Sequence, residues 1–557
     1  MSQAALAPER PAAVSARDVA FALAVVLPLA AIIAPYRPIH LPQVFILGIA
    51  FVGGLWCVKT AVEDVERLFF VFLLYIPFQK VLPGDFGGAA RAVNFTNAFL
   101  VLFVFGWLSR VAAVEKGYTP RRKGAIGALL VLFLVMTSVS IAAEALRRGE
   151  AFGYSLFADL KRWLVPFVIY FFVTAMVSSK RTIKRMYVAV LVTTAVIGLL
   201  GVKQFWLDMG GGSRQNLEGV RIAVTSGPSN LGALFAYYLP YLVALLLVHI
   251  RNLAWWPLLL PIGWCLDSLR TTFSRGALVA FLGAASAVVF KRSKLAFVAL
   301  AALAVVALHG RELSLPYSIF GRMTATYNAD RPGESFKDKL DTSSQKRLTI
   351  WEGGLDMMLE HPFLGVGYGR FPERIGDYRP SVANMDPHNN FLKIGAEMGL
   401  PALACFLVVL GACLVKGWRL SNSSGDPLTR ALLLGYVGSV VGLFLANLFG
   451  SRLESAEIST QFWALTGGVV VLDRFRREEA ARAAGVSDSG QDEEEGPGIE
   501  RCGDGDGLEE NSQGPAGGYN TAAVGRMPGA TSHRETFGPA YLRGEAPPAH
   551  GAGGGRP

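Results

Sequence analysis

Residues 229–249 have the sequence SNLGALFAYYLPYLVALLLVH and contain no Lys, Arg, Asp or Glu. A helix needs about 20 predominantly apolar residues to cross the roughly 30 Å hydrocarbon core of a bilayer. A stretch of this length without a charge therefore predicts a transmembrane helix. Similar stretches recur on both sides of it, from about residue 19 to residue 473.

These stretches predict an all-α polytopic membrane protein with about fourteen transmembrane helices, within a range of about 12–14. Two of these spans could be re-entrant or tilted segments rather than full crossings: 254–270, because it contains Pro and Trp, and 68–82, because it is short. The expected spans are 19–36, 41–58, 68–82, 96–113, 124–145, 162–179, 185–206, 229–249, 254–270, 275–290, 294–309, 398–416, 429–449 and 459–473.

The composition excludes a water-soluble enzyme, because 52% of the 557 residues are hydrophobic. The net charge of +10 resides mostly in short connections between apolar spans, which indicates membrane topology rather than nucleic-acid binding. Four of the five cysteines lie in apolar spans and Cys502 lies in a polar segment. Neither a disulfide framework nor zinc-binding spacing is present, and no metal or other cofactor is expected.

Lys and Arg in the short connections predict the orientation of the chain. More of these residues face the cytoplasm when both termini are placed there, in a bacterial inner membrane. The first span follows Arg10 and Arg17, but without a convincing cleavage site it is expected to be a retained helix. The expected parts are a cytoplasmic N-terminus (1–18), helices 1–11 (19–309), a large periplasmic loop (310–397), helices 12–14 (398–473) and a disordered cytoplasmic tail (474–557).

The large loop is expected to contain short helices. One amphipathic helix should begin after the cap-like residues Asp341 to Ser343 and end before Pro362. Its predicted apolar face recurs at helical spacing and consists of Leu348, Trp351, Leu355, Met358 and Leu359.

Arg221, Arg275 and His388 gather on the outer face once this topology is drawn. Arginine presents a planar, permanently charged fork that matches phosphate oxygens, so two arginines suit a lipid-linked diphosphate without a metal. A transfer to a sugar hydroxyl needs a proton acceptor, and imidazole titrates nearest neutral pH. His388 is the candidate base. The plainer alternatives are a histidine that caps a helix or meets solvent, and arginines that reach lipid headgroups.

Two further carboxylates lie near the expected membrane boundary. Asp267 should pair with Arg270 or Arg275, because an unpaired carboxylate at membrane depth is costly, and a proton relay is the less favoured alternative. Glu397 could orient His388 or an arginine, or simply mark the interface.

The glycine-rich run GVGYG at 365–369 lacks the strand and helix that a dinucleotide-binding loop needs. It predicts a tight backbone path in which Tyr368 could stack on a sugar ring.

Several motifs in order resemble the O-antigen ligase/polymerase superfamily. The resemblance covers roughly residues 215–415, and the motifs are Arg221 with SNLGA at 229–233, TFSRG at 272–276, RLTIW at 347–351, HPFLGVGYG at 361–369, HNNFL at 388–392 and EMGL at 397–400.

The resemblance implies a membrane glycosyltransferase that takes a glycan from an undecaprenyl-diphosphate carrier at the periplasmic face, without nucleotide sugar or metal. It implies that Arg221 and Arg275 grip the diphosphate and that His388 serves the acceptor hydroxyl. The motif residues expected to bind substrate are Arg347, Trp351, Tyr368, Asn389 and Glu397.

The motifs leave three acceptors open: a growing glycan, as in a polymerase; the lipid A core, as in an O-antigen ligase; or a protein hydroxyl. The alternative from another class is a transporter or flippase of polysaccharide or lipid-linked glycan. Such proteins place ionisable groups near mid-bilayer, whereas the candidates here cluster at one face. The expected partners are the lipid-linked donor, an acceptor and membrane lipids, with no nucleic acid.

Overall fold

The structure is a computed structural model of the whole chain. It describes residues 18–23, 55–61, 63–80, 95–113, 124–149, 154–208, 221–225, 227–309, 326–328, 331 and 335–483. All of them belong to one compact unit, Met1–Ser487, and Asp488–Pro557 form a second unit. Most of the expected spans 19–36 and 41–58, and the tail beyond residue 483, lie outside the described residues.

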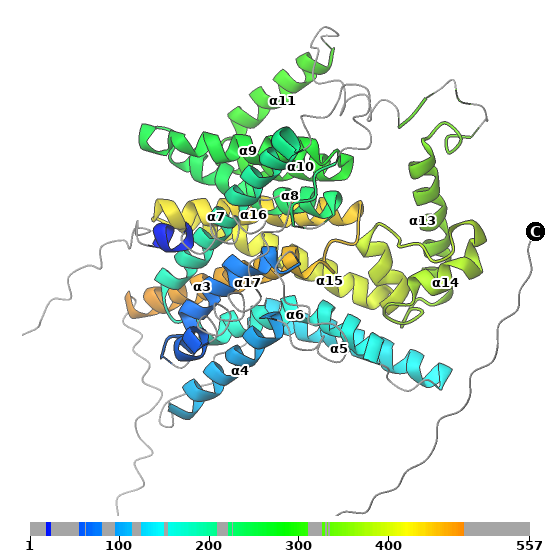
Figure 1. The fold of residues 1–557 in the computed structure, drawn as a ribbon, viewed down its shortest axis with the longest axis horizontal. Coiled ribbons are helices and arrows are strands. Elements are labelled where there is room, and N and C mark those ends of the chain that lie inside the picture. The colour runs from blue at the N-terminus through cyan, green and yellow to red at the C-terminus, as the bar shows by residue number, and fades with distance from the viewer. Residues whose placement is uncertain are drawn as a thin grey trace, which may run out of the picture. The chain divides into compact units, whose positions relative to one another are not determined.

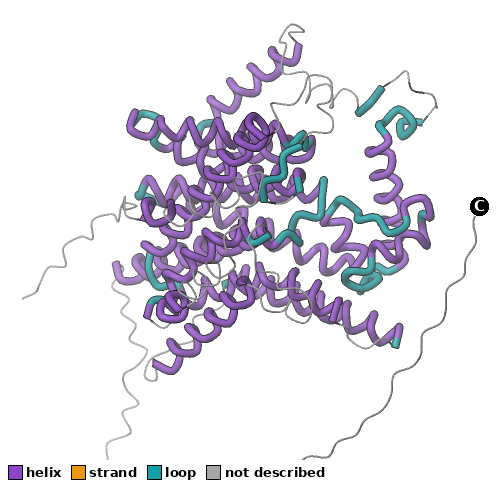
Figure 2. Tube along the Cα trace, viewed as in Figure 1, coloured by secondary structure: helices purple, strands orange, loops and turns teal. Residues whose placement is uncertain are grey.

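The described part of the chain is all-helical, as the sequence predicts, and Figure 2 colours no strand in it. Its one extended pairing is an isolated bridge between Tyr327 and Leu340. The helices up to residue 271 are α3 (Val65–Tyr75), η1 (Ile76–Phe78), α4 (Phe95–Ala113), α5 (Ala125–Arg148), α6 (Tyr154–Met176), α7 (Lys180–Lys203), the π-helical turn η3 (Gln204–Asp208), α8 (Pro228–Val248), η4 (Leu253–Leu258) and α9 (Leu259–Thr271). The later helices are α10 (Arg275–Arg292), α11 (Lys294–His309), α13 (Thr342–Glu360), α14 (Phe371–Tyr378), η5 (Pro380–Val382), α15 (Asn390–Ser423), α16 (Pro427–Leu448) and α17 (Ala456–Ala483).

Five of the described helices are long and apolar enough to cross a membrane, which makes the chain a multi-pass membrane protein. Each overlaps an expected span. They are Ala125–Arg147, Lys180–Leu207, Pro228–Val248, Asn390–Ser423 and Pro427–Leu448.

The expected spans 254–270 and 68–82 are not single long α-helices. The first is the 3-10 helix η4 followed by α9, which has 13 residues, and the second centres on α3, which has 11. At about 1.5 Å per residue, an α-helix of that length covers roughly 20 Å or less of a core that is about 30 Å thick. Pro257 and Pro77 lie in the 3-10 segments beside them, where the backbone leaves α-helical geometry.

Helices α8, α10 and α16 pack against one another and form the scaffold of the site (Figure 1). Small residues allow the close approach. A Cβ atom at Gly232 of α8 would lie 2.6 Å from the Cβ of Ala277, and one at Gly442 of α16 would lie 2.2 Å from the carbonyl oxygen of Ala236. Side chains at these positions would push the helices apart, so the two glycines allow the short distance between the helices.

Helix α15 bends at Gly399, whose φ of 86° and ψ of 168° lie outside the helical region, and Pro401 follows. The preceding loop is fastened to this bend. Leu400 donates its N–H to the carbonyl of Pro362 (2.7 Å), and Val366 donates to the carbonyl of Ala396 (2.9 Å). The residues of α15 before the bend thus belong to the region expected as the large loop.

The amphipathic helix expected in that loop is α13, and its predicted apolar face is partly correct. Met358 is buried and Trp351 packs against the buried cluster, but two of the predicted leucines are exposed. Leu355 is 51% exposed and Leu359 is 76% exposed. The buried residues of α13 are Ile350, Gly353, Gly354, Met357 and Met358. Because two glycines line this face, Ile375 and Leu392 can pack directly against the helix backbone, and the contact face is rotated away from the leucines.

Candidate functional site

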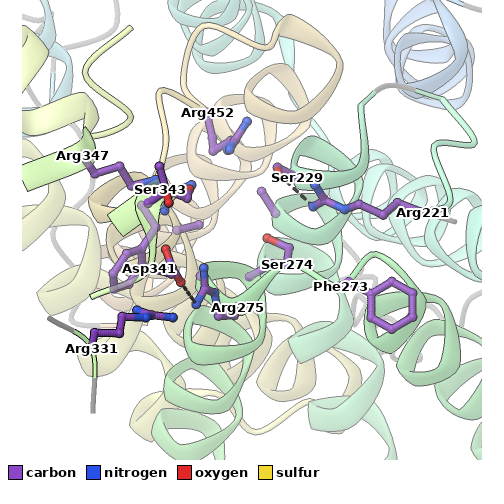
Figure 3. A pocket seen from close by; sticks show the side chains of 16 residues that line it. Arg221, Ser229, Phe273, Ser274, Arg275, Arg331, Asp341, Ser343, Arg347 and Arg452 are labelled. Atoms are coloured by element: carbon purple, nitrogen blue, oxygen red, sulfur yellow. Dashed lines mark hydrogen bonds and ion pairs between the residues drawn. The ribbon is translucent and has the colours of Figure 1, made fainter. Parts of the chain in front are cut away.

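A pocket of about 480 Å³ is lined by five arginines and one carboxylate among the described residues (Figure 3). The carboxylate is Asp341. The arginines come from distant parts of the chain and are Arg221, Arg275, Arg331, Arg347 and Arg452. Such an excess of guanidinium groups over carboxylates favours a ligand with more than one negative charge.

Three helices begin at this pocket. Ser229 lies in the first turn of α8, Arg275 is the first residue of α10, and Asp341 is the N-cap residue of α13; all three line the cavity. Ser274, the N-cap residue of α10, also lines it and makes no capping hydrogen bond with its side chain. Helix N-termini carry partial positive charge and free N–H groups, so they add to the attraction for an anion.

Arg275 and Asp341 form an ion pair, with 2.7 Å between Nη1 and Oδ2, and Arg275 also bonds the hydroxyl of Thr326. Burial raises the pKa of Asp341, but hydrogen bonds from Arg275 and from Ser344 outweigh it and hold this pKa below its ordinary value. Asp341 is therefore a carboxylate at neutral pH, and it also caps α13 by accepting the Ser344 N–H at 2.7 Å.

Two other lining arginines donate hydrogen bonds to neutral groups. Arg221 donates from Nε to the Thr272 carbonyl (2.9 Å) and from Nη2 to the Ser229 hydroxyl (3.5 Å). Arg331 donates to the Lys339 carbonyl at 3.1 Å.

Arg347 makes no hydrogen bond or ion pair with any residue that the structure describes. Burial lowers its pKa, the charge of Arg275 lowers it further and Asp341 raises it, so the two guanidinium groups repel each other and Asp341 offsets only part of that repulsion. An anion between them would relieve that repulsion.

His388 lies beside the pocket rather than in its lining. Its side chain is 46% exposed, and its Nδ1 lies 3.4 Å from Oδ1 of Asp386. Partial burial lowers its pKa, Asp386 raises it, and Arg347 and Arg452 lower it. The imidazole is within electrostatic reach of two lining arginines, and at neutral pH it is mostly unprotonated.

Neighbouring side chains hold the His388 segment in place. The indole N–H of Trp351 donates to the Pro387 carbonyl (2.9 Å), and the Asn389 side chain caps α15 by accepting the N–H groups of Phe391 and Leu392. The Trp351 indole and the Asn389 side-chain oxygen, expected to bind substrate, thus make contacts that fix the backbone on either side of His388.

The backbone is strained near Arg275 and at His388. Phe273 has a φ of 50° and His388 a φ of 49°, in the left-handed region that side chains with a Cβ rarely adopt. Phe273 lies two residues before Arg275. Such strain persists only where the surroundings enforce it, and it clusters at functional sites.

Two of the expected substrate-binding residues lie in the protein interior. Glu397 is 0% exposed and accepts the Phe371 N–H at 3.0 Å. Tyr368 is 6% exposed, and its ring centroid lies 6.0 Å from that of Trp163, so its faces are not open to a sugar ring in this structure.

Asp267 pairs with Arg270, with 2.6 Å between Oδ1 and Nη2, and also accepts the indole N–H of Trp206 at 2.8 Å. The ion pair predicted from the sequence is confirmed, with Arg270 rather than Arg275 as the partner. No group of three His, Cys, Asp or Glu residues in the described ranges could hold a metal ion.

Sequence reasoning missed Arg331, Arg452 and Asp386. Arg331 and Arg452 line the pocket, and Asp386 accepts the N–H of His388 at 2.8 Å. Asp386 precedes the recognised HNNFL motif by only two residues, so its proximity to His388 was a usable signal. Arg452 is a single arginine in a short connection between apolar spans, which nothing distinguishes from a topology signal.

Residues 260–407 match the family model described as O-antigen ligase. A Rickettsia conorii protein that is named provisionally as a polysaccharide ligase is 26% identical over 139 residues, which are 23% of this chain and 31% of that relative. The match therefore covers less than a third of the relative's length. Together these similarities confirm the family resemblance predicted from the motifs. The matched family segment contains Arg275, Arg347 and His388 and ends before Arg452.

Proposed function

We propose, since residues 260–407 match the O-antigen ligase family model, that this chain is a membrane glycosyltransferase acting at the periplasmic face of the bacterial inner membrane. It transfers or polymerises an oligosaccharide from an undecaprenyl-diphosphate carrier, and the acceptor is a glycan, the lipid A core or a protein hydroxyl. Both termini are cytoplasmic, and about fourteen helices cross the membrane.

The observation that carries the proposal is the pocket in which five arginines and three helix N-termini surround a single carboxylate. A diphosphate carries the charge and the oxygen geometry that such a pocket selects. The pocket lies where α8, α10 and α13 begin, and a site at helix ends favours a reaction at the membrane surface over transport through its middle.

In the proposed reaction, the acceptor oxygen forms a bond to the anomeric carbon of the donor sugar. The bond from that carbon to the diphosphate oxygen breaks, and its electron pair leaves with the diphosphate. Arg221, Arg275 and Arg347 stabilise the charge that develops on the departing group, as prepositioned donors do in other enzymes. His388 accepts the proton of the acceptor hydroxyl, and the diphosphate leaves without needing a proton.

The test is a deletion strain complemented with variants whose surface glycans are sized. The variants are Arg275→Ala and Arg275→Lys, and both should fail to restore long chains, because Lys lacks the planar fork. Unchanged glycan length and amount with Arg275→Ala at normal protein level would contradict the proposal. In the deletion strain itself, attached single repeats indicate a polymerase, whereas free carrier-linked chains indicate a ligase.

A further inference from the structure

A short turn, residues 450–455, contacts both the arginine pocket and the His388 segment. Arg452 lines the pocket. Ser451 donates its hydroxyl to Oδ1 of Asp386 (2.9 Å), the same oxygen that accepts the His388 N–H, and Glu454 pairs with Lys393 at 2.5 Å. The turn lies outside the matched family segment, and no step of the reaction proposed above is assigned to any of its residues.

Buried groups fix the backbone of this turn. The side-chain oxygen of Asn447 accepts the N–H groups of Arg452 (3.0 Å) and Leu453 (3.1 Å). The side-chain nitrogen of Asn447 donates to the hydroxyl of Tyr237 at 2.6 Å, and both of these side chains are 0% exposed. The Asn447 side chain satisfies its buried amide groups through these hydrogen bonds, so no polar group is left unpaired there. The bonds also hold the backbone at Arg452 and so fix the direction of its side chain.

The guanidinium of Arg452 has a neutral partner where a charged one would be expected. Nη1 donates to the side-chain oxygen of Asn230 (2.6 Å), and no carboxylate pairs with Arg452 among the residues that the structure describes. Burial lowers its pKa, Tyr237 and Asp386 raise it, and the charges of Arg347 and Arg221 lower it; the net shift is downward. Arg347 and Arg221 repel this cation although Asp386 attracts it, so an anionic ligand bound among the three guanidinium groups would be stabilised.

We infer that this turn completes the donor site: Arg452 binds the diphosphate, and Ser451, acting through Asp386, positions His388. The inference rests on the proposed function and extends it to a segment that the family model does not match. Asp386 receives the His388 N–H and faces Nδ1, so it holds both the strained backbone and the ring, leaving Nε2 for the acceptor hydroxyl. Asp386 and Ser451 are positioning residues, because neither touches the reacting atoms.

The binding role is tested with inorganic pyrophosphate, titrated by calorimetry into the purified full-length chain in lipid nanodiscs. Arg452→Gln should weaken binding about tenfold, as the loss of a charged hydrogen bond does. Arg379→Gln is the matched control: Arg379 lies between α14 and η5 and pairs with Asp356 outside the pocket, so binding should not change. If Arg452→Gln does not fold, Arg452→Lys is measured in its place, and it should show a smaller but measurable loss of pyrophosphate affinity.

Arg275→Gln separates the two proposals. Lost binding in Arg275→Gln together with wild-type binding in the Arg452 variants would overturn this inference and leave the proposed function standing. Unchanged pyrophosphate binding in Arg275→Gln would instead contradict the assignment of this pocket to a diphosphate, and the proposed function would fail with it.

The positioning role is tested by glycan transfer measured against pH. Asp386→Asn and Ser451→Ala should keep pyrophosphate binding and lower the transfer rate, and Ser451→Thr should restore it. Because the Asp386 carboxylate raises the pKa of His388, Asp386→Asn should also move the acid limb of the profile to lower pH. A merely structural role would lower the rate with the limb unmoved, and that result would overturn the assignment.

Discussion

Nη1 of Arg275 lies 2.7 Å from Oδ2 of Asp341, so the first residue of α10 is tied to the N-cap residue of α13. The pair joins the helical scaffold to the region expected as the large loop, and both residues line the arginine pocket. Asp341 is the one lining carboxylate among the described residues, and it holds a guanidinium that a diphosphate would also seek. Carboxylate and ligand therefore compete for Arg275.

Asp341→Asn should tighten pyrophosphate binding about fivefold, which corresponds to the removal of a partly exposed competing charge. Asparagine is as good an N-cap residue as aspartate, so α13 should still form. The measurement is a calorimetric titration of pyrophosphate at low and high salt, and the gain should shrink as salt rises. Weaker binding at low salt, with α13 intact by circular dichroism, would mean that Asp341 serves to place Arg275 rather than to compete for it.

His388→Ala should reduce glycan transfer about a hundredfold or more while leaving pyrophosphate binding unchanged, because the imidazole is proposed to act on the acceptor and not on the diphosphate. A general base works in its neutral form, and partial burial together with Arg347 and Arg452 lowers the pKa of His388. The wild-type rate should accordingly rise through an acid limb below about pH 6.5 and stay level above it. A limb that persists in His388→Ala would assign the base to another residue.

The fold class and the family resemblance were accessible from the sequence because both depend on local patterns. The charge-free stretch at 229–249 became α8 almost residue for residue, and the cap at Asp341 marked the start of α13. Length alone could not tell a single long α-helix from the 3-10 and α pair at 253–271, because a proline changes the local helix geometry without interrupting the apolar run.

The parts of the site that were not foreseen depend on tertiary packing. Leu355 and Leu359 follow helical spacing as well as the residues that are buried, but Gly353 and Gly354 decide which face of α13 meets its neighbours. A glycine pair does not register in an apolar count. Arg452 reaches the pocket only because Asn447 holds the following turn against Tyr237, a contact between residues far apart in the chain.

Gly399→Ala should destabilise the protein by about 2 kcal/mol or more, because both the backbone and the space at this bend exclude a side chain. The φ of Gly399 is 86°, and a Cβ there would lie 2.2 Å from the carbonyl oxygen of Phe363. Gly411→Ala is the matched control within α15, because a Cβ at Gly411 meets nothing within 4 Å. Thermal unfolding in detergent should show a loss for the first variant and little change or a gain for the second. Equal stability of the two variants would show that the bend tolerates a side chain and is not required.

The orientation of the chain is open to a test with two single cysteines in whole cells. Ser343→Cys lies at the exposed start of α13 in the loop expected to be periplasmic, and Gly425→Cys lies in the exposed connection between α15 and α16 expected to be cytoplasmic. A membrane-impermeant maleimide should label Ser343→Cys in intact cells and should label Gly425→Cys only after the cells are opened. The native Cys265, Cys405 and Cys413 are buried, and replacing Cys57 and Cys502 with serine removes the remaining background. The opposite labelling pattern would place the arginine pocket in the cytoplasm. It would contradict the orientation predicted from the Lys and Arg bias, and a periplasmic acceptor could then not reach His388.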